Sequence, residues 1–260
     1  MNLGIAGKRA FLAASSQGLG LACARSLARE GVHVTLNGRS AEKLHAAAQA
    51  LREEADGAMV DAVVADLTTE EGLELIFAAC SDLDILVTNN AGPKPGALGD
   101  WDEEALVRAL RANAVPAVLL MRRYIPKMQF AGFGRVVNIT SAQVKGPRPD
   151  MGLSTSARAA LTAISKAISL DVAKDNVTIN NLLPERFDTP RQEFMARRFM
   201  DADGITREEA YARIASTIAA RRLGRPEEFG DACAFLCSAQ AGYISGQNLQ
   251  LDGGSYAGLV

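Results

Sequence analysis

Short apolar runs alternate with segments of helical pattern along most of the chain. Apolar runs bounded by turn residues are typical of strands buried on both faces. Their alternation with helices predicts a parallel sheet with right-handed crossovers. We therefore predict an α/β fold, a Rossmann-like doubly wound parallel sheet of about seven strands flanked by helices. The predicted strands are residues 8–14, 32–36, 58–65, 84–88, 135–139, 177–182 and 248–251, the last at an edge.

The segments between these strands have the spacing of amphipathic helices. The first begins at the turn of residues 15–20 and continues to about residue 30. The other predicted helices are residues 41–54, 72–79, 101–128, 154–173, 195–200, 205–220 and 226–237. No repeat, low-complexity tract or linker divides the 260 residues, so one domain over 1–260 is expected. Within it, 188–222 is either a helical lobe that covers a substrate or a pair of surface helices.

Composition favours a cytoplasmic protein with a small-molecule substrate. The net charge is −2 and 48% of the residues are hydrophobic, which predicts neither nucleic-acid nor membrane partners. There is no run of 18 apolar residues, and the first ten residues do not resemble a signal peptide. The four cysteines lie in apolar helical patterns and only two histidines occur, so we expect buried free thiols and no metal site.

A glycine-containing turn follows the first predicted strand and opens a helix. Gly18 and Gly20 would let the backbone approach a pyrophosphate, and the helix N-terminus favours its negative charge. After the second strand stands Arg39, which would pair with a 2′-phosphate and so favours NADP over NAD, unless it is simply solvated. Asp66, after the third strand, would accept a hydrogen bond from the adenine or cap the next helix.

Residues 133–165 contain a second candidate site. The fifth strand ends at Thr140 and Ser141, where α/β sheets bind their ligands. A loop leads to a helix on which Ser154 and Arg158, four residues apart, share a face. These residues form either a catalytic edge or a capped helix with an exposed arginine. Pro116 predicts a kink in the helix of residues 101–128, with the carbonyl of Ala112 left free.

Together these motifs resemble the short-chain dehydrogenase/reductase family, in particular its members similar to 3-oxoacyl-carrier-protein reductase. The resemblance covers nearly the whole chain. Residues 14–20 match the cofactor loop, with Ala14 in place of its first glycine, and 89–92 match the NNAG motif. Residues 134–141 match the strand ending in the substrate-binding serine. Residues 180–189 match the segment that covers the nicotinamide, with Glu185 in place of a glycine.

The resemblance also implies a homo-tetramer or homo-dimer, because residues 222–229 and 245–254 match signatures where the family makes subunit contacts. It implies that the catalytic residues are Asn113, Ser141, Ser154 and Arg158. It implies that cofactor is bound by Ala14, Ser16, Gln17, Gly18, Leu19, Gly20, Arg39, Asp66, Leu67, Asn90, Ala91, Gly92, Pro184, Phe187 and Thr189.

The chain departs from the family at the residues that carry the chemistry. The family's Tyr-x-x-x-Lys motif should begin thirteen residues after Ser141, which places Ser154 at the tyrosine position and Arg158 at the lysine position. A serine hydroxyl titrates far above a phenol, whose pKa is about 10, and arginine stays charged and cannot relay protons. Losing a positioned acid typically costs about 10²–10⁴-fold in rate. Arg158 can still hold ribose hydroxyls, a carboxylate or a phosphate.

Further basic residues lie in the loops of the same sheet edge: Lys94, Lys145, Arg148 and Arg186. Clustered there, they would indicate an anionic substrate, with Lys145 as a replacement proton donor. The alternative is that they are solvated loop charges.

Three functions agree with this sequence. The first is an NADP(H)-dependent oxidoreductase that reduces a carbonyl or oxidises an alcohol with an altered acid/base set. The second is a lyase or isomerase on the same fold, in which Arg158 and the two lysines, Lys94 and Lys145, stabilise a developing oxyanion. The third is a catalytically silent NADP(H)-binding subunit or sensor. The fold does not distinguish them, because all three share it.

Overall fold

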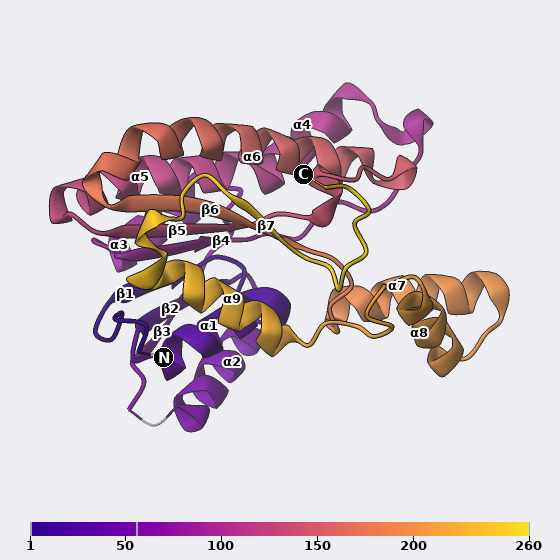
Figure 1. Cartoon of the computed structure of the whole chain (residues 1–260), viewed down its shortest axis with the longest axis horizontal. Helices are drawn as coiled ribbons and strands as arrows, with labels where there is room; N and C mark the ends of the chain where they lie inside the picture. The colour runs from indigo at the N-terminus through magenta and orange to yellow at the C-terminus, as the bar shows by residue number, and fades with distance from the viewer. Residues whose placement is uncertain (1, 56, 260) are drawn as a thin grey trace.

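A seven-stranded parallel sheet forms the centre of the molecule (Figure 1). The computed structural model describes residues 2–55 and 57–259. The strands lie in the order β3-β2-β1-β4-β5-β6-β7, so the predicted fold class is confirmed and residues 248–251 are an edge strand. The order reverses between β1 and β4, which opens a crevice at the carboxyl ends of the strands. The strands are β1 (Arg9–Leu12), β2 (His33–Gly38), β3 (Val60–Val64), β4 (Ile85–Thr88), β5 (Gly134–Ile139), β6 (Val177–Pro184) and β7 (Asn248–Leu251).

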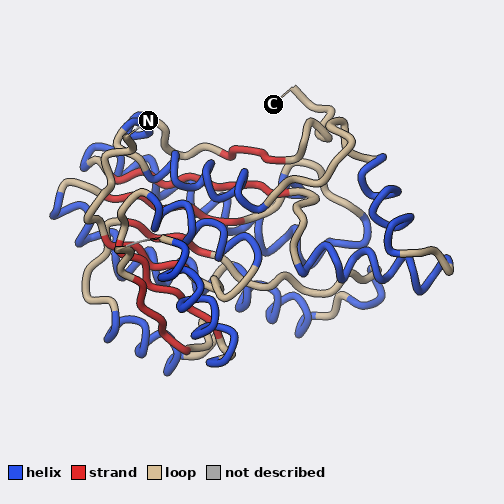
Figure 2. The backbone as a smooth tube through the Cα atoms, turned by 90° about the horizontal axis from the view of Figure 1, so that it is seen from below, coloured by secondary structure: helices blue, strands red, loops and turns tan. Residues whose placement is uncertain are grey.

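Helices cover both faces of the sheet (Figures 1 and 2). One face packs against α1, α2 and α9, and the other against α3, α5 and α6. The predicted bounds of 41–54 and 226–237 are those observed. The helices are α1 (Gly18–Arg29), α2 (Ala41–Glu54), α3 (Glu70–Ala79), α4 (Glu103–Asn113), α5 (Val115–Ala131), α6 (Gly152–Val172), α7 (Pro190–Asp203), α8 (Arg207–Ser216) and α9 (Pro226–Cys237).

The inner strands are largely apolar on both sides because each side is covered by helices. Neighbouring residues of β1 illustrate this: Leu12 belongs to the core cluster under α1 and α9, whereas Phe11 belongs to the cluster under α5 and α6. Both side chains are fully buried. The four cysteines are free and buried, as predicted. Among the described residues, no helix is both long and apolar enough to span a bilayer.

The prediction of one helix over residues 101–128 is wrong. The chain forms α4 and α5, which meet at Ala114, whose φ of −118° departs from helical geometry. Pro116 lies in the first turn of α5, where its missing N–H costs nothing. The expected kink near Asn113 is therefore a complete break.

The segment 188–222 contains two helices that protrude from the body (Figure 1). Helix α7 is longer than the predicted 195–200, and α8 is shorter than the predicted 205–220. The two pack on each other through a small cluster of Ala196, Ala210 and Ile214, separate from the two main cores. Thr206 begins α8 with a capping box completed by Glu209, which explains why this helix starts after residue 205.

Candidate active site at the carboxyl edge of the sheet

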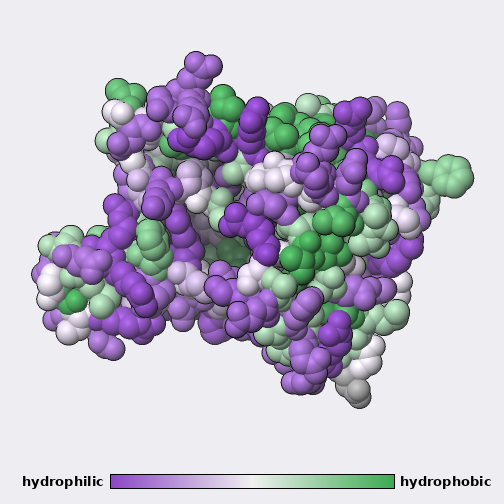
Figure 3. Space-filling model, turned by 180° about the vertical axis from the view of Figure 1, so that it is seen from behind, coloured by the Kyte–Doolittle hydropathy of each residue, from purple (hydrophilic) through white to green (hydrophobic). Residues whose placement is uncertain are grey.

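A cavity of about 580 Å³ opens at the carboxyl ends of the strands, between the body and the protruding helices. The view from behind shows a hollow there, rimmed largely by hydrophilic side chains (Figure 3). Three of the predicted catalytic residues and nearly all of the predicted cofactor residues line it. The lining residues include Ala14, Ser16, Gln17, Gly18, Leu19, Arg39, Asp66, Leu67, Asn90, Ala91, Gly92, Ser141, Ser154, Arg158, Pro184, Phe187 and Thr189.

Several predicted site residues do not line this cavity. Asn113 borders a small neighbouring space, and Gly20 lies beneath the cofactor loop. Of the predicted substrate residues, Arg148 and Arg186 line the cavity, but Lys94 and Lys145 do not. Lys94 is exposed to solvent, and the Lys145 ammonium lies 5.8 Å from the centre of the Tyr256 ring.

The glycine turn after β1 has the backbone geometry of a tight ligand loop. Gly18 has a φ of +62°, and a Cβ on Gly20 would lie 2.7 Å from the carbonyl oxygen of Ala14. Glycine is therefore required at both positions. Ala14 itself has a φ of +45°, a conformation that costs an alanine about 1–2 kcal/mol. Two hydrogen bonds hold it there: its N–H donates to Asn37 Oδ1 at 3.2 Å, and its carbonyl accepts from Asn89 Nδ2 at 3.1 Å.

The N-terminus of α1 faces the cavity without a side-chain cap. Gln17 is the N-cap residue and makes no capping hydrogen bond, and the first turn carries no acidic residue. The free N–H groups and the positive end of the helix dipole therefore remain available to an anion. This is the arrangement that a pyrophosphate requires.

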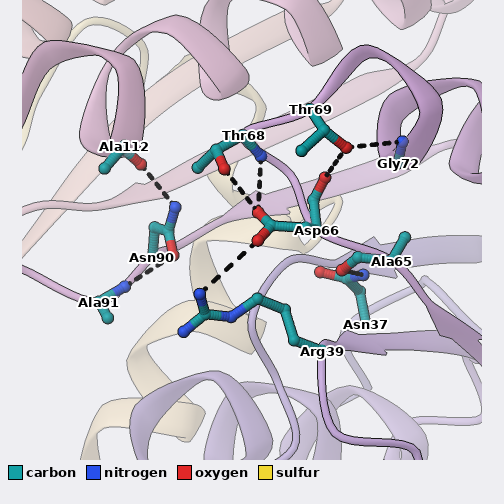
Figure 4. Close-up of polar contacts among 10 residues, drawn as sticks. All are labelled: Asn37, Arg39, Ala65, Asp66, Thr68, Thr69, Gly72, Asn90, Ala91 and Ala112. Atoms are coloured by element: carbon teal, nitrogen blue, oxygen red, sulfur yellow. Dashed lines mark hydrogen bonds and ion pairs between the residues drawn. The ribbon is translucent and has the colours of Figure 1, made fainter. Parts of the chain in front are cut away.

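Arg39 and Asp66 meet across the ends of β2 and β3 (Figure 4). Arg39 Nη1 lies 3.6 Å from Asp66 Oδ2, and Asp66 Oδ1 accepts from the N–H and the hydroxyl of Thr68. Partial burial favours the protonated acid, but the Thr68 hydrogen bonds and the Arg39 charge outweigh it and lower the pKa of Asp66. The alternative that Asp66 caps the next helix is wrong, because Thr69 caps α3 by accepting from the Gly72 N–H at 3.0 Å.

The NNAG motif connects the cofactor loop to the break between α4 and α5. Asn90 Nδ2 donates to the Ala112 carbonyl at 2.6 Å, and Asn90 Oδ1 accepts from the Ala91 N–H (Figure 4). The Ala112 carbonyl is available because Pro116 has no N–H, as predicted. Asn113, the next residue, is buried beside a space of about 10 Å³, roughly the volume one water molecule needs. Arg158 borders the same space.

Ser154 and Arg158 form a hydrogen-bonded pair on the cavity wall. Arg158 Nη1 donates to Ser154 Oγ, and Arg158 Nε donates to the Thr140 carbonyl at 3.1 Å. Ser141 Oγ accepts from the Gln143 N–H at 3.2 Å. The alternative of an exposed arginine is wrong, since Arg158 is half-buried and Ser154 is buried. The catalytic role of the pair remains a prediction.

The Arg158 guanidinium is a cation without a counter-charge. Among the described residues it makes no ion pair. Burial, together with repulsion from Arg191, lowers the pKa of Arg158 to about 10. Gly92 leaves room for this group, because a Cβ there would lie 3.0 Å from both of its terminal nitrogens. The glycine of the NNAG motif therefore accommodates the arginine of α6.

The cavity residues on α7 are absent from the sequence-based set, and two of them, Arg191 and Gln192, are polar. Arg191 donates to the Pro93 carbonyl at 3.4 Å. Gln192 is buried, and its Nε2 has no hydrogen-bond partner among residues 2–55 and 57–259. Both lie in the first turn of α7, directly after Thr189 and Pro190. Pro190 could have located this turn, because proline is favoured at the first position of a helix. A helix that begins six residues after the end of β6 starts near the carboxyl edge of the sheet, where the cavity lies.

Known proteins resemble this chain over its whole length. Residues 13–256 match the family described as enoyl-(acyl carrier protein) reductase. An uncharacterised oxidoreductase, YvaG of Bacillus subtilis, is 33% identical over 98% of both chains, and the NADPH-dependent reductase BacG of the same organism is 30% identical over 95% of this chain and 97% of its own. The structure of L-sorbose reductase from Gluconobacter frateurii, complexed with NADPH and L-sorbose, superposes with a TM-score of 0.94 at 30% identity and covers both chains completely.

Proposed function

Because the chain belongs to the short-chain dehydrogenase/reductase family, we propose that it is an NADP(H)-dependent oxidoreductase that reduces a carbonyl or oxidises an alcohol. In this proposal Ser154 and Arg158 stand in the places of the family's catalytic tyrosine and lysine. The observation that carries it is one cavity that joins the glycine turn, Arg39 and the Ser154–Arg158 pair.

The residues of the cavity fit a dinucleotide phosphate. The uncapped N-terminus of α1, approached over Gly18, would hold the pyrophosphate. Arg39 is 74% exposed and only loosely paired with Asp66, so it is free to turn to a 2′-phosphate. Asp66, Leu67, Asn90 and Ala91 would surround the adenosine half, and Pro184, Phe187 and Thr189 the nicotinamide half. NADP(H), when bound, supplies or accepts the hydride.

The chain's own residues would mainly orient the substrate and stabilise charge on its oxygen, and would contribute little to proton transfer. Ser141 and Ser154 would hold the substrate oxygen by hydrogen bonds. Arg158, with a pKa near 10, stays protonated at neutral pH and would stabilise negative charge that develops on that oxygen. A serine hydroxyl is a poor acid, so we expect the proton to come from water. The small space beside Asn113 and Arg158 offers a place for such a water.

Excess positive charge in the cavity wall supports an anionic small-molecule substrate. Five arginines line it, namely Arg39, Arg148, Arg158, Arg186 and Arg191, against two acidic residues, Asp66 and Glu185. The lobe of 188–222 contributes Arg191, Phe194 and Met195 to the same wall. These side chains support the interpretation that the lobe covers a substrate.

We also propose a homo-dimer or homo-tetramer as the working assembly. The edge strand β7 presents Leu249 with 39% of its surface exposed, within the segment that matches the family's subunit-contact signature. Light scattering on the purified protein would give the mass directly, and a monomer would contradict this.

Fluorescence titration with NADPH and with NADH tests the proposed cofactor. We expect NADPH to bind at least tenfold more tightly, since a charge-assisted pair with Arg39 is worth about 1.5–3 kcal/mol. Arg39→Ala should remove this preference and leave NADH binding unchanged. Arg29→Ala, on the far turn of α1, is the matched control. Equal affinity for the two cofactors would contradict the proposed role of Arg39.

A silent NADP(H)-binding subunit is the second candidate, favoured by the Ser154–Arg158 pair itself. It predicts cofactor binding without turnover, and a gain of reductase activity only when Ser154→Tyr and Arg158→Lys are combined. The oxidoreductase instead must consume NADPH or NADP⁺ in proportion to its substrate. Substrate conversion without a change in cofactor absorbance would support neither of these and would indicate a lyase or isomerase.

A further inference from the structure

The first turn of α7 brings one unused hydrogen-bond donor, the side-chain amide of Gln192, to the wall of the same cavity as Arg158. Gln192 is 5% exposed and lines the cavity, and its Nε2 has no hydrogen-bond partner in the part of the chain that the structure describes. A buried donor without a partner typically costs about 1–3 kcal/mol, so such groups persist where a ligand uses them. Thr189, the N-cap of α7, makes no capping bond, because its hydroxyl donates to the Phe187 carbonyl.

Arg191 adds a second guanidinium to this corner. It lies at the cavity mouth, with its charge 5.4 Å from the centre of the Phe194 ring. No carboxylate among the described residues pairs with Arg191 or Arg158. The two acidic residues of the wall are already engaged, Asp66 with Arg39 and Glu185 with Arg186. Two neighbouring cations without an anion between them repel, and a bound anion would remove that cost.

We infer that Arg158, Arg191 and Gln192 form a receptor for a substrate carboxylate. Two guanidinium groups and one amide N–H suit the two oxygens of that planar group. Arg158 also donates to Ser154 Oγ, so the carboxylate would lie next to the oxygen that Ser154 holds. The substrate class is then a small 2-hydroxy acid or the corresponding 2-oxo acid. This assignment rests on the proposed oxidoreductase function for the reaction, but not for the binding.

Racemic lactate and racemic lactamide are suitable probes, because they share the hydroxyl group and differ chiefly in the charge of the acid group. Calorimetric titration of the protein saturated with NADP⁺ should show lactate binding about tenfold or more tightly than lactamide. Arg191→Met and Gln192→Leu should each lower the affinity for lactate at least several-fold. Arg198→Met, an exposed arginine of the same helix outside the cavity wall, is the control for loss of one positive charge. Its charge acts on Arg191 only from a distance, so lactate affinity should change far less than in Arg191→Met.

Each opposing result has a distinct meaning. Equal binding of lactate and lactamide, or no lactate binding to protein that binds NADPH normally, would overturn the carboxylate receptor and leave the proposed cofactor intact. If Arg191→Met lowers the affinity for NADPH as much as the affinity for lactate, Arg191 contacts the cofactor and the inference is wrong. Inorganic phosphate binding in preference to lactate would likewise assign the corner to a phosphate. If NADPH does not bind at all, the proposed function fails, and the same titrations without cofactor still test the receptor.

Discussion

Two groups of polar residues at the centre of this molecule differ in how fully their hydrogen bonds are used. One is a ladder across the sheet, in which Thr88, Asn138, Asn181 and Asn248 lie side by side on β4, β5, β6 and β7. Thr88 Oγ1 donates to Asn138 Oδ1 at 2.6 Å, Asn138 Nδ2 to Asn181 Oδ1 at 3.0 Å, and Asn181 Nδ2 to Asn248 Oδ1 at 2.8 Å. Asn138 also donates to Ser165 Oγ.

The other group is at the cavity, where donors remain unused. Arg158 has no counter-charge and Gln192 Nε2 has no partner among the described residues. Both groups are polar and largely enclosed, but only the ladder is satisfied from within the chain. The ladder therefore stabilises the fold, whereas under the proposed function the cavity residues would lower stability and serve binding.

Asn138→Leu should have the largest effect on stability. The Asn138 side chain hydrogen-bonds to partners on β4, β6 and α6. Its loss leaves the Thr88 hydroxyl, the Asn181 carbonyl oxygen and the Ser165 hydroxyl buried without that partner. We expect the free energy of unfolding to fall by about 3 kcal/mol or more. Denaturant unfolding measures this. Asn248→Ala, at the half-buried end of the ladder, should cost only about 1 kcal/mol, and equal losses would show that the ladder is not a connected network.

Arg158→Met should separate stability from binding. Its folded-state pKa is depressed to about 10, so the cation costs stability at every pH below that value, and removing it should raise the free energy of unfolding by about 1 kcal/mol. Lactate affinity or turnover should fall at least tenfold in the same variant. A variant that loses both stability and binding would show that Arg158 is structural, like the ladder residues.

Ala14→Gly should stabilise the cofactor loop. The left-handed φ of +45° strains alanine but not glycine, and the gain is partly offset by the greater freedom of glycine in the unfolded chain, so about 0.5–1 kcal/mol is expected. Thermal unfolding is sensitive enough to detect it. Ala14→Val is the matched control and should destabilise, because β-branched residues tolerate this conformation least. Equal unfolding temperatures for the wild type, Ala14→Gly and Ala14→Val would show that the backbone of Ala14 is not strained.

Asp66→Asn should give the smallest change, visible only in acid. The pKa of Asp66 is lowered in the folded protein, so its contribution to stability is complete above the unfolded pKa near 4 and is lost as the pH falls below that value. Between about pH 4 and pH 2 the wild type should therefore lose stability more steeply than the variant. If the free energies of unfolding of the wild type and the variant changed in parallel with pH, the contacts with Thr68 and Arg39 would not stabilise the ionised Asp66.

Elements with strong local signals could be predicted closely from the sequence. Helix α2 begins after Ser40, whose side chain accepts from the Lys43 N–H, and α9 begins with Pro226 at its first position. Both bounds were predicted correctly. The break at Ala114 was anticipated only as a kink. Proline alone does not decide such a case, since Pro126 lies inside the continuous helix α5.

The site divides in the same way. Asp66, Asn90 and Ser141 follow the ends of three parallel strands, whose carboxyl ends share one edge of the sheet, and all three line one cavity. Lys94 and Lys145 lie in loops of that edge, but their side chains do not line the cavity. Arg186 does line it, and its own backbone has a left-handed φ of +58°. Loop backbone geometry, which the sequence pattern does not reveal, decides such directions.

The order of strands and helices, the glycine turn, and the placement of Ser154 and Arg158 on one helical face all follow from the amino-acid sequence, because they depend on periodicity and on neighbours in the chain. Which charges are paired and which remain free, in contrast, is set by the packing of the folded chain. Glu185 pairs with Arg186 and Asp66 with Arg39, while Arg158 and Arg191, 33 positions apart, meet at one corner without an acid. Pairing depends on distances between elements remote in the sequence, and the packing of α6 and α7 around the sheet sets those distances.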